Sequence, residues 1–154
     1  MNPRLKGNLL VVGQFLLLAL LVLSPTSNFL VAELAFIVPA ISLTLMFLGA
    51  VILIIAFIGL GPALTAHPIP NKKARLQTGG LYKWVRHPIY LGLLLIALAL
   101  TLTGGIFPQI LYFIALYLLL NYKARFEEAQ LSLRFSDYQA YAQKTGRFLP
   151  RLKR

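Results

Sequence analysis

The sequence predicts an all-α integral membrane protein: one domain over residues 1–154, built as a bundle of four transmembrane helices with both termini in the cytoplasm. Of the 154 residues, 58% are hydrophobic and 12% are charged, whereas soluble domains carry about 25% charged residues. Such a chain cannot cover itself with a polar surface, so its composition excludes a soluble globular enzyme and a disordered chain. The chain has no cysteine, and therefore neither a disulfide framework nor a thiolate site.

Four apolar segments supply the expected helices, since crossing a hydrocarbon core of ~30 Å takes roughly 17–20 residues. The first spans about residues 9–23 and follows Arg4 and Lys6. A cleaved signal peptide has the same arrangement. No small-residue cleavage site follows, however, and residues 24–28 are typical of a turn. We therefore expect a retained helix.

Proline and glycine mark the limits of the other three spans. The second span, about 38–60, ends at Gly61. The third, about 88–103, begins with Pro88, a residue suited to the first turn of a helix. Only Gly104-Gly105 separates it from the fourth span, about 106–122, which predicts a tight helical hairpin.

The basic residues determine the expected orientation. Two precede the first span, five lie in a loop at residues 61–87, and eight lie in a tail at residues 123–154, which accounts for all 15. The connection between the first two spans contains Glu33 and no Lys or Arg. Because cytoplasmic loops are enriched in Lys and Arg, four spans place every basic residue on the cytoplasmic side. Membrane topology thus explains the net charge of +11 better than a nucleic-acid partner does.

Polar residues precede the third span. Arg86 and His87 stand directly before Pro88, which predicts His87 at the helix N-cap and Tyr90 one turn further on the same face. The exposed N–H groups of the first turn, together with Arg86 and His87, would suit a carboxylate or a phosphate. The alternative is an interfacial anchor of basic and aromatic side chains.

A second polar group follows the fourth span. Glu127 and Glu128 are two of only four acidic residues, and Lys123 and Arg125 precede them. A carboxylate here could hold a ligand ammonium, and Lys123 or Arg125 could hold a substrate carboxylate. The alternative is a solvated helix end in which Lys123 and Glu127 form an i,i+4 pair.

A metal site is not expected. His67 and His87 are the only two histidines, there is no cysteine, and no carboxylate stands at ligand spacing from either of them.

These two polar groups resemble the conserved blocks of a known family. The first block is Leu76-Gln77-Thr78-Gly79-Gly80-Leu81-Tyr82 followed by Arg86-His87-Pro88-Ile89-Tyr90-Leu91-Gly92. The second is Glu127-Glu128 with Leu131, Phe135, Tyr138, Tyr141 and Arg147-Phe148-Leu149-Pro150. Together they resemble the isoprenylcysteine carboxyl methyltransferases and their prokaryotic relatives, which are allied to the phospholipid methyltransferases. The resemblance covers about residues 62–150.

The resemblance implies a membrane-embedded methyltransferase that uses S-adenosylmethionine and has no Rossmann domain. It implies that Lys123 faces the substrate and that Glu127 binds the amino-acid end of the cofactor. Arg125 is the other basic candidate for catalysis, and Glu128 would act as the base if the acceptor is an amine. The expected cofactor contacts, with Arg86 added from its own chemistry, are His67, Arg75, Leu76, Gln77, Tyr82, Arg86, His87, Pro88, Ile89, Tyr90 and Glu127.

Several alternatives stay open at this point. The acceptor is either the carboxylate of a prenylcysteine-like compound or a lipid amine. A membrane reductase using NADPH is a second possible enzyme, although two phosphates would need more basic contacts than the region of Arg86 offers. A non-enzymatic scaffold is the third. The expected partners are membrane lipids and a lipophilic or lipid-linked substrate, with no nucleic acid, and the oligomeric state is open.

Overall fold

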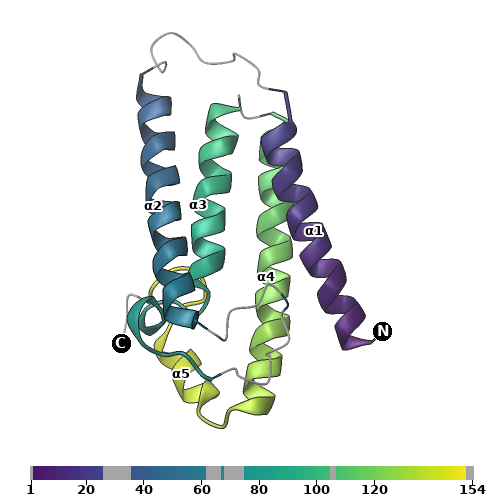
Figure 1. The fold of residues 1–154 in the computed structure, drawn as a ribbon, viewed down its shortest axis with the longest axis vertical. Helices are drawn as coiled ribbons and strands as arrows, with labels where there is room; N and C mark the ends of the chain where they lie inside the picture. The colour runs from purple at the N-terminus through teal and green to yellow at the C-terminus, as the bar shows by residue number, and fades with distance from the viewer. Residues whose placement is uncertain (1, 26–35, 62–66, 68–74, 105–106, 152–154) are drawn as a thin grey trace.

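The structure, a computed structural model, describes residues 2–25, 36–61, 67, 75–104 and 107–151. Throughout these residues the regular structure is helical, which confirms the predicted all-α class. The helices are α1 (Pro3–Leu23), α2 (Ile37–Leu60), the short 3₁₀ helix η3 (Gly80–Lys83), α3 (Pro88–Thr103), α4 (Gln109–Arg134) and α5 (Tyr138–Lys144). The four long helices run in alternate directions, and the two ends of the chain lie at the same end of the bundle as α5 (Figure 1).

Two helices extend beyond the apolar segments that predicted them. α1 begins at Pro3 because Asn2 caps it: the Asn2 side chain accepts a hydrogen bond from the Arg4 N–H at 3.0 Å. α4 continues past residue 122 through the charged segment to Arg134. α3 has the predicted limits, and α2 begins one residue before the predicted position.

Two glycines at positive φ lie at the limits of helices, and the sequence predicts the break at Gly61. Gly61 follows α2 with φ 50°, and Gly80 begins η3 with φ 58°, values that favour glycine. Residues 26–28 of the predicted turn, Glu33, the Lys72-Lys73 pair of the basic loop and Gly105 lie outside the described residues.

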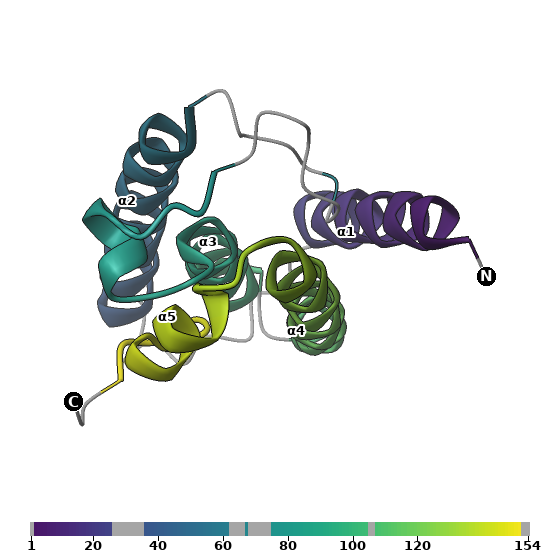
Figure 2. The same ribbon diagram turned by 90° about the horizontal axis from the view of Figure 1, so that it is seen from below.

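The helices pack as two pairs joined through α3 and α4. α2 lies along α3, α1 lies along α4, and α3 contacts α4, as Figure 2 shows from below. α2 and α3 approach closely at two glycines: a Cβ at Gly49 would lie 2.8 Å from the carbonyl oxygen of Gly92. The buried apolar core is shared by α1, α3 and α4 and contains Leu21, Tyr90, Leu94, Ala97, Leu116, Leu120 and Ala124.

The outer helices expose apolar side chains. α1 and α2 are long and apolar enough to cross a membrane, and only 17% of the most apolar stretch of each is buried. Phe47 is 66% exposed and Ile58 is 75% exposed. A core helix of a soluble protein would bury such residues, so these faces support a membrane protein.

Candidate active site

The tail of the chain pairs with the segment that leads into α3. The Arg86 N–H donates to the Gly146 carbonyl at 2.8 Å, and the His87 N–H donates to the Arg147 carbonyl at 3.1 Å. His87 is the N-cap of α3, and Pro88 is its first residue, as the sequence predicts. This pairing holds the start of α3 beside the last turns of α4.

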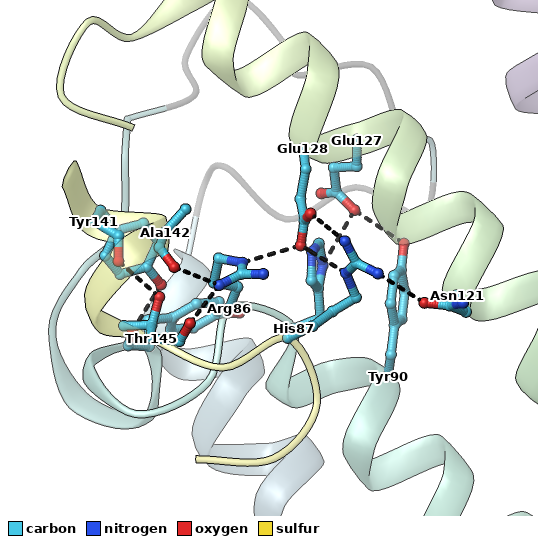
Figure 3. Close-up of polar contacts among 11 residues, drawn as sticks. Arg86, His87, Tyr90, Asn121, Glu127, Glu128, Tyr141, Ala142 and Thr145 are labelled. Carbon is cyan, nitrogen blue, oxygen red and sulfur yellow. Dashed lines mark hydrogen bonds and ion pairs between the residues drawn. The ribbon is translucent and has the colours of Figure 1, made fainter. Parts of the chain in front are cut away.

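The Glu128 carboxylate lies at the centre of an ionic cluster (Figure 3). Its Oε1 accepts from Arg86 Nε at 3.0 Å, and its two oxygens accept from Arg147 Nε and Nη2 at 3.0 and 2.8 Å. His87 Nε2 lies 3.1 Å from Oε1. Burial alone would raise the pKa of Glu128, but hydrogen bonds from His87, Arg147 and Arg86 outweigh it and hold that pKa well below its ordinary value.

Both arginines of this cluster also bind the surrounding elements. Arg86 Nη1 donates to the carbonyls of Ala142, at 2.9 Å, and Thr145. Arg147 Nη1 donates to Asn121 Oδ1 at 2.9 Å. Sequence reasoning did not single out Arg147 or Asn121 as site residues, although Arg147 belongs to the tail block that carries the resemblance.

Glu127 shares His87 with Glu128 but contacts Tyr90 in place of the two arginines. Tyr90 Oη donates to Glu127 Oε2 at 3.0 Å, and His87 Nδ1 lies 3.6 Å from the same oxygen. The rings of His87 and Tyr90 are stacked, with centroids 5.2 Å apart. These contacts join the N-terminal end of α3 to the acidic segment of α4. The Glu127 side chain is 29% exposed, against 14% for Glu128, and is therefore the more accessible acid.

A cavity of about 320 Å³ lies beside Glu127. Its volume is at the lower end of the range for ligand pockets, about 300–1,000 Å³. All four long helices and η3 contribute to its wall. The polar lining side chains are Gln14, Tyr82, Arg86, His87, Tyr90, Lys123 and Glu127, and the apolar ones are Phe15, Leu18, Phe57, Leu60, Pro88, Ile89 and Leu93.

Lys123 is buried in the wall of this cavity. It is only 1% exposed, and its Nζ donates to Gln14 Oε1 at 2.6 Å. The Nζ also lies 5.3 Å from the centre of the Tyr90 ring. Lys123 therefore turns toward α1, and within the described residues no ion pair joins it to Glu127. Gln14 was missed by sequence reasoning; the signal that could have revealed it is the one amide within the apolar segment 9–23.

The remaining predicted residues lie outside the cavity wall. Gln77 Nε2 donates to the Gly59 carbonyl at 3.0 Å, and a ring nitrogen of His67 lies 3.4 Å from the Arg4 carbonyl. Leu76 is half-buried, and Arg75 and Arg125 are exposed. Glu128 belongs to the ionic cluster. The described ranges contain no group of three or more His, Asp or Glu side chains that could hold a metal ion.

Comparison with known proteins adds one finding. No curated protein and no solved structure matches the chain. The model of the isoprenylcysteine carboxyl methyltransferase family matches residues 34–133, more than half of the chain. The match includes α2, α3 and the part of α4 that carries Lys123 and Glu127, and it favours methyl transfer over the reductase and scaffold alternatives. The chain therefore belongs to the isoprenylcysteine carboxyl methyltransferase family.

Proposed function

We propose that this chain is an integral membrane methyltransferase that transfers the methyl group of S-adenosylmethionine to a lipophilic acceptor at the cytoplasmic face of a membrane. Family membership supports the chemistry. The observation that carries the proposal is the cavity where Glu127, Tyr90 and Lys123 meet apolar side chains of α1 and α2. Such a cavity offers a polar wall to charged groups and an apolar wall to a lipophilic chain.

The polar wall fits the chemical groups of S-adenosylmethionine. Glu127 offers a carboxylate to the cofactor ammonium. The rings of Tyr82 and Tyr90 offer faces to the sulfonium or the adenine. The first-turn N–H groups of α3, which no side chain caps, suit the cofactor carboxylate. His67, Arg75, Leu76 and Gln77, which do not line the cavity, stay predictions from the resemblance.

The contribution of the protein to the reaction would be alignment. When bound, S-adenosylmethionine would supply a methyl group on a positively charged sulfur, which becomes a neutral thioether on transfer. Lys123 would hold an anionic end of the acceptor, and the cavity walls would orient it; alignment of reacting groups can lower a barrier by several kcal/mol. Arg125 is exposed and keeps only the role of an alternative basic contact.

The ionic cluster favours a carboxylate acceptor over an amine. An amine acceptor needs a base, for which Glu128 was the candidate. Arg86, His87 and Arg147 keep the Glu128 carboxylate ionised, so it would take up a proton poorly. A carboxylate acceptor is already ionised and needs no base. We therefore assign Glu128 a positioning role: it holds His87 and the tail in place.

The membrane arrangement is also part of the proposal. We propose that all four long helices span the bilayer and that the α5 end, with the site, faces the cytoplasm, in accordance with the positive-inside rule. The apolar part of the acceptor would reach the cavity from the bilayer past Phe15 and Phe57. Both side chains line the cavity, and they are 57% and 41% exposed.

Calorimetry on detergent-purified protein tests the proposal. We expect heat of binding with S-adenosylmethionine and with its demethylated product, and at least tenfold weaker binding in Glu127→Gln, since a hydrogen bond to a charged group contributes roughly 1.5–3 kcal/mol. Asp137→Asn, which removes an exposed acid outside the cavity, is the matched control. A radiolabelled methyl assay would compare a prenylcysteine analogue with a lipid amine. The absence of heat with either ligand at millimolar concentration, from folded protein, would contradict the proposal.

A further inference from the structure

α1 lies before the segment that matches the family, yet it forms part of the cavity. It contributes Gln14, Phe15 and Leu18 to the wall. Gln14 is 6% exposed and sits between apolar residues of a helix with a largely exposed apolar surface. Burying an amide in such surroundings costs free energy unless the amide makes hydrogen bonds. A buried amide that lines the cavity is therefore expected to bind a ligand or to orient another side chain.

Gln14 and Lys123 line the cavity together and share one hydrogen bond, which leaves further donors on both side chains. Gln14 Oε1 accepts one proton of the Lys123 ammonium at 2.6 Å. Within the part of the chain that the structure describes, the other Nζ protons and the Gln14 Nε2 amide have no hydrogen-bond partner. Gln14 Oε1 is neutral, the centre of the Tyr90 ring lies 5.3 Å away, and the Glu127 carboxylate acts on Lys123 without forming an ion pair, so the buried positive charge is compensated incompletely. An anion with two acceptor oxygens would accept hydrogen bonds from the remaining Nζ protons of Lys123 and from Gln14 Nε2.

We infer that Gln14 is a positioning and specificity residue for the methyl acceptor, and this inference rests on the proposed function. Gln14 Oε1 fixes the Lys123 ammonium, and Gln14 Nε2 adds a second donor beside it. The two side chains form a cradle for the ionised carboxylate of a lipophilic acid. A lipid that ends in a neutral amide adds no counter-charge to the buried ammonium and binds more weakly.

Two variants of Gln14 and a control on the same helix test this inference. Gln14→Leu removes both polar atoms at similar volume, and Gln14→Glu places a carboxylate beside Lys123. Asn8→Leu is the control, because Asn8 is an exposed polar residue of α1 that does not line the cavity. Three quantities are measured in detergent: Kd for the demethylated cofactor, KM and kcat for a prenylcysteine analogue, and the inhibition constant of the primary amide of that analogue.

We expect Gln14→Leu to raise KM about tenfold, the usual effect of losing a hydrogen bond to a charged group. Its Kd for the cofactor and its affinity for the neutral amide stay within about twofold of wild type, so the preference for acid over amide falls about tenfold. Gln14→Glu raises KM further, because the new carboxylate occupies Lys123 and repels the acceptor. Asn8→Leu leaves all three quantities unchanged.

The outcomes separate this inference from the proposed function. An active wild type with an unchanged KM and acid preference in Gln14→Leu overturns the inference and leaves the function standing. An equal loss of affinity for acid, amide and cofactor would show a purely structural role and also overturn it. If Gln14→Leu fails to fold, Gln14→Glu alone decides, since an unchanged acid preference there overturns the inference. A wild type that neither binds the cofactor nor transfers methyl groups overturns both.

Discussion

The substitution Glu128→Gln should destabilise the fold without removing any side chain from the cavity wall. The glutamine has nearly the same shape as the glutamate but no charge. It would leave the guanidinium groups of Arg86 and Arg147 without their counter-charge at a site where Arg86 and Glu128 are 12% and 14% exposed. Arg86 also holds the carbonyls of Ala142 and Thr145, so its displacement would loosen the end of α5.

The size of the effect follows from the burial. Breaking a buried ion pair by removing one partner costs about 3–5 kcal/mol. Arg147 is 28% exposed and keeps part of its hydration, and the glutamine can still accept hydrogen bonds. The low end, about 3 kcal/mol, therefore applies. For a chain of this size Tm falls about 2–4 °C per kcal/mol, so we expect Tm to drop by about 6–12 °C.

The neighbouring acid provides the control. Glu127 accepts one hydrogen bond, from Tyr90, and pairs with no arginine among the described residues. Glu127→Gln should thus lower Tm by no more than about 4 °C, the effect of about 1 kcal/mol, while it weakens cofactor binding at least tenfold. Thermal unfolding in detergent and calorimetry on both variants measure the two effects. Equal Tm values for Glu128→Gln and wild type would refute the reasoning, and so would a larger fall in Tm for Glu127→Gln than for Glu128→Gln.

The same cluster predicts a pH dependence. Because the folded pKa of Glu128 lies below its ordinary value of 4.5, the stabilisation is present above that pH and is lost as the pH falls toward the folded pKa. The difference in Tm between wild type and Glu128→Gln should therefore narrow between about pH 5 and pH 3. If the difference in Tm widens as the pH falls over this interval, the pKa of Glu128 is raised by folding and not lowered.

Two further predictions concern packing and topology. Gly49→Ala should cost about 1–3 kcal/mol because its Cβ would lie 2.8 Å from the Gly92 carbonyl oxygen. Gly59→Ala, whose Cβ would meet its nearest atom at 3.6 Å, should be neutral or stabilising; thermal unfolding compares the two. The chain has no cysteine, so Ser136→Cys and Thr103→Cys each introduce a single thiol that can be labelled. The two thiols lie at opposite ends of the bundle. A membrane-impermeant maleimide should label Ser136→Cys from the cytoplasmic side and Thr103→Cys from the other side, and labelling of both from one side would contradict the topology.

The sequence predicts the limits of a helix correctly where the helix ends at the same residues as its apolar segment. Pro88 and Gly104 set both limits of α3, and the structure has it at the predicted residues. α4 differs because hydropathy reports where an apolar surface ends, and a helix can continue beyond that point. Its backbone hydrogen bonds run on past Lys123 to Arg134 although the side chains become polar.

The site was predictable in part. Pro88 places His87 at the N-cap, and helical spacing then places Tyr90 on the face that reaches Glu127. Charge and helical spacing alone do not distinguish Glu127 from Glu128, and only the family resemblance assigned the cofactor to Glu127. The difference between their surroundings could not be predicted. It depends on Arg147, which the tail brings back across α4. Gln14 could not be assigned either, because its partner Lys123 is far along the chain and only the packing of α1 on α4 brings them together.

The backbone pairing of the tail with the segment before α3 has a consequence for biosynthesis. Chains are made from the N-terminus at about 5–20 residues per second. The partners of Arg86 and His87, Gly146 and Arg147, are translated after all four long helices. A nascent chain can thus complete all four long helices before the tail fixes the start of α3, and the site proposed for the cofactor would be the last part of the molecule to assemble.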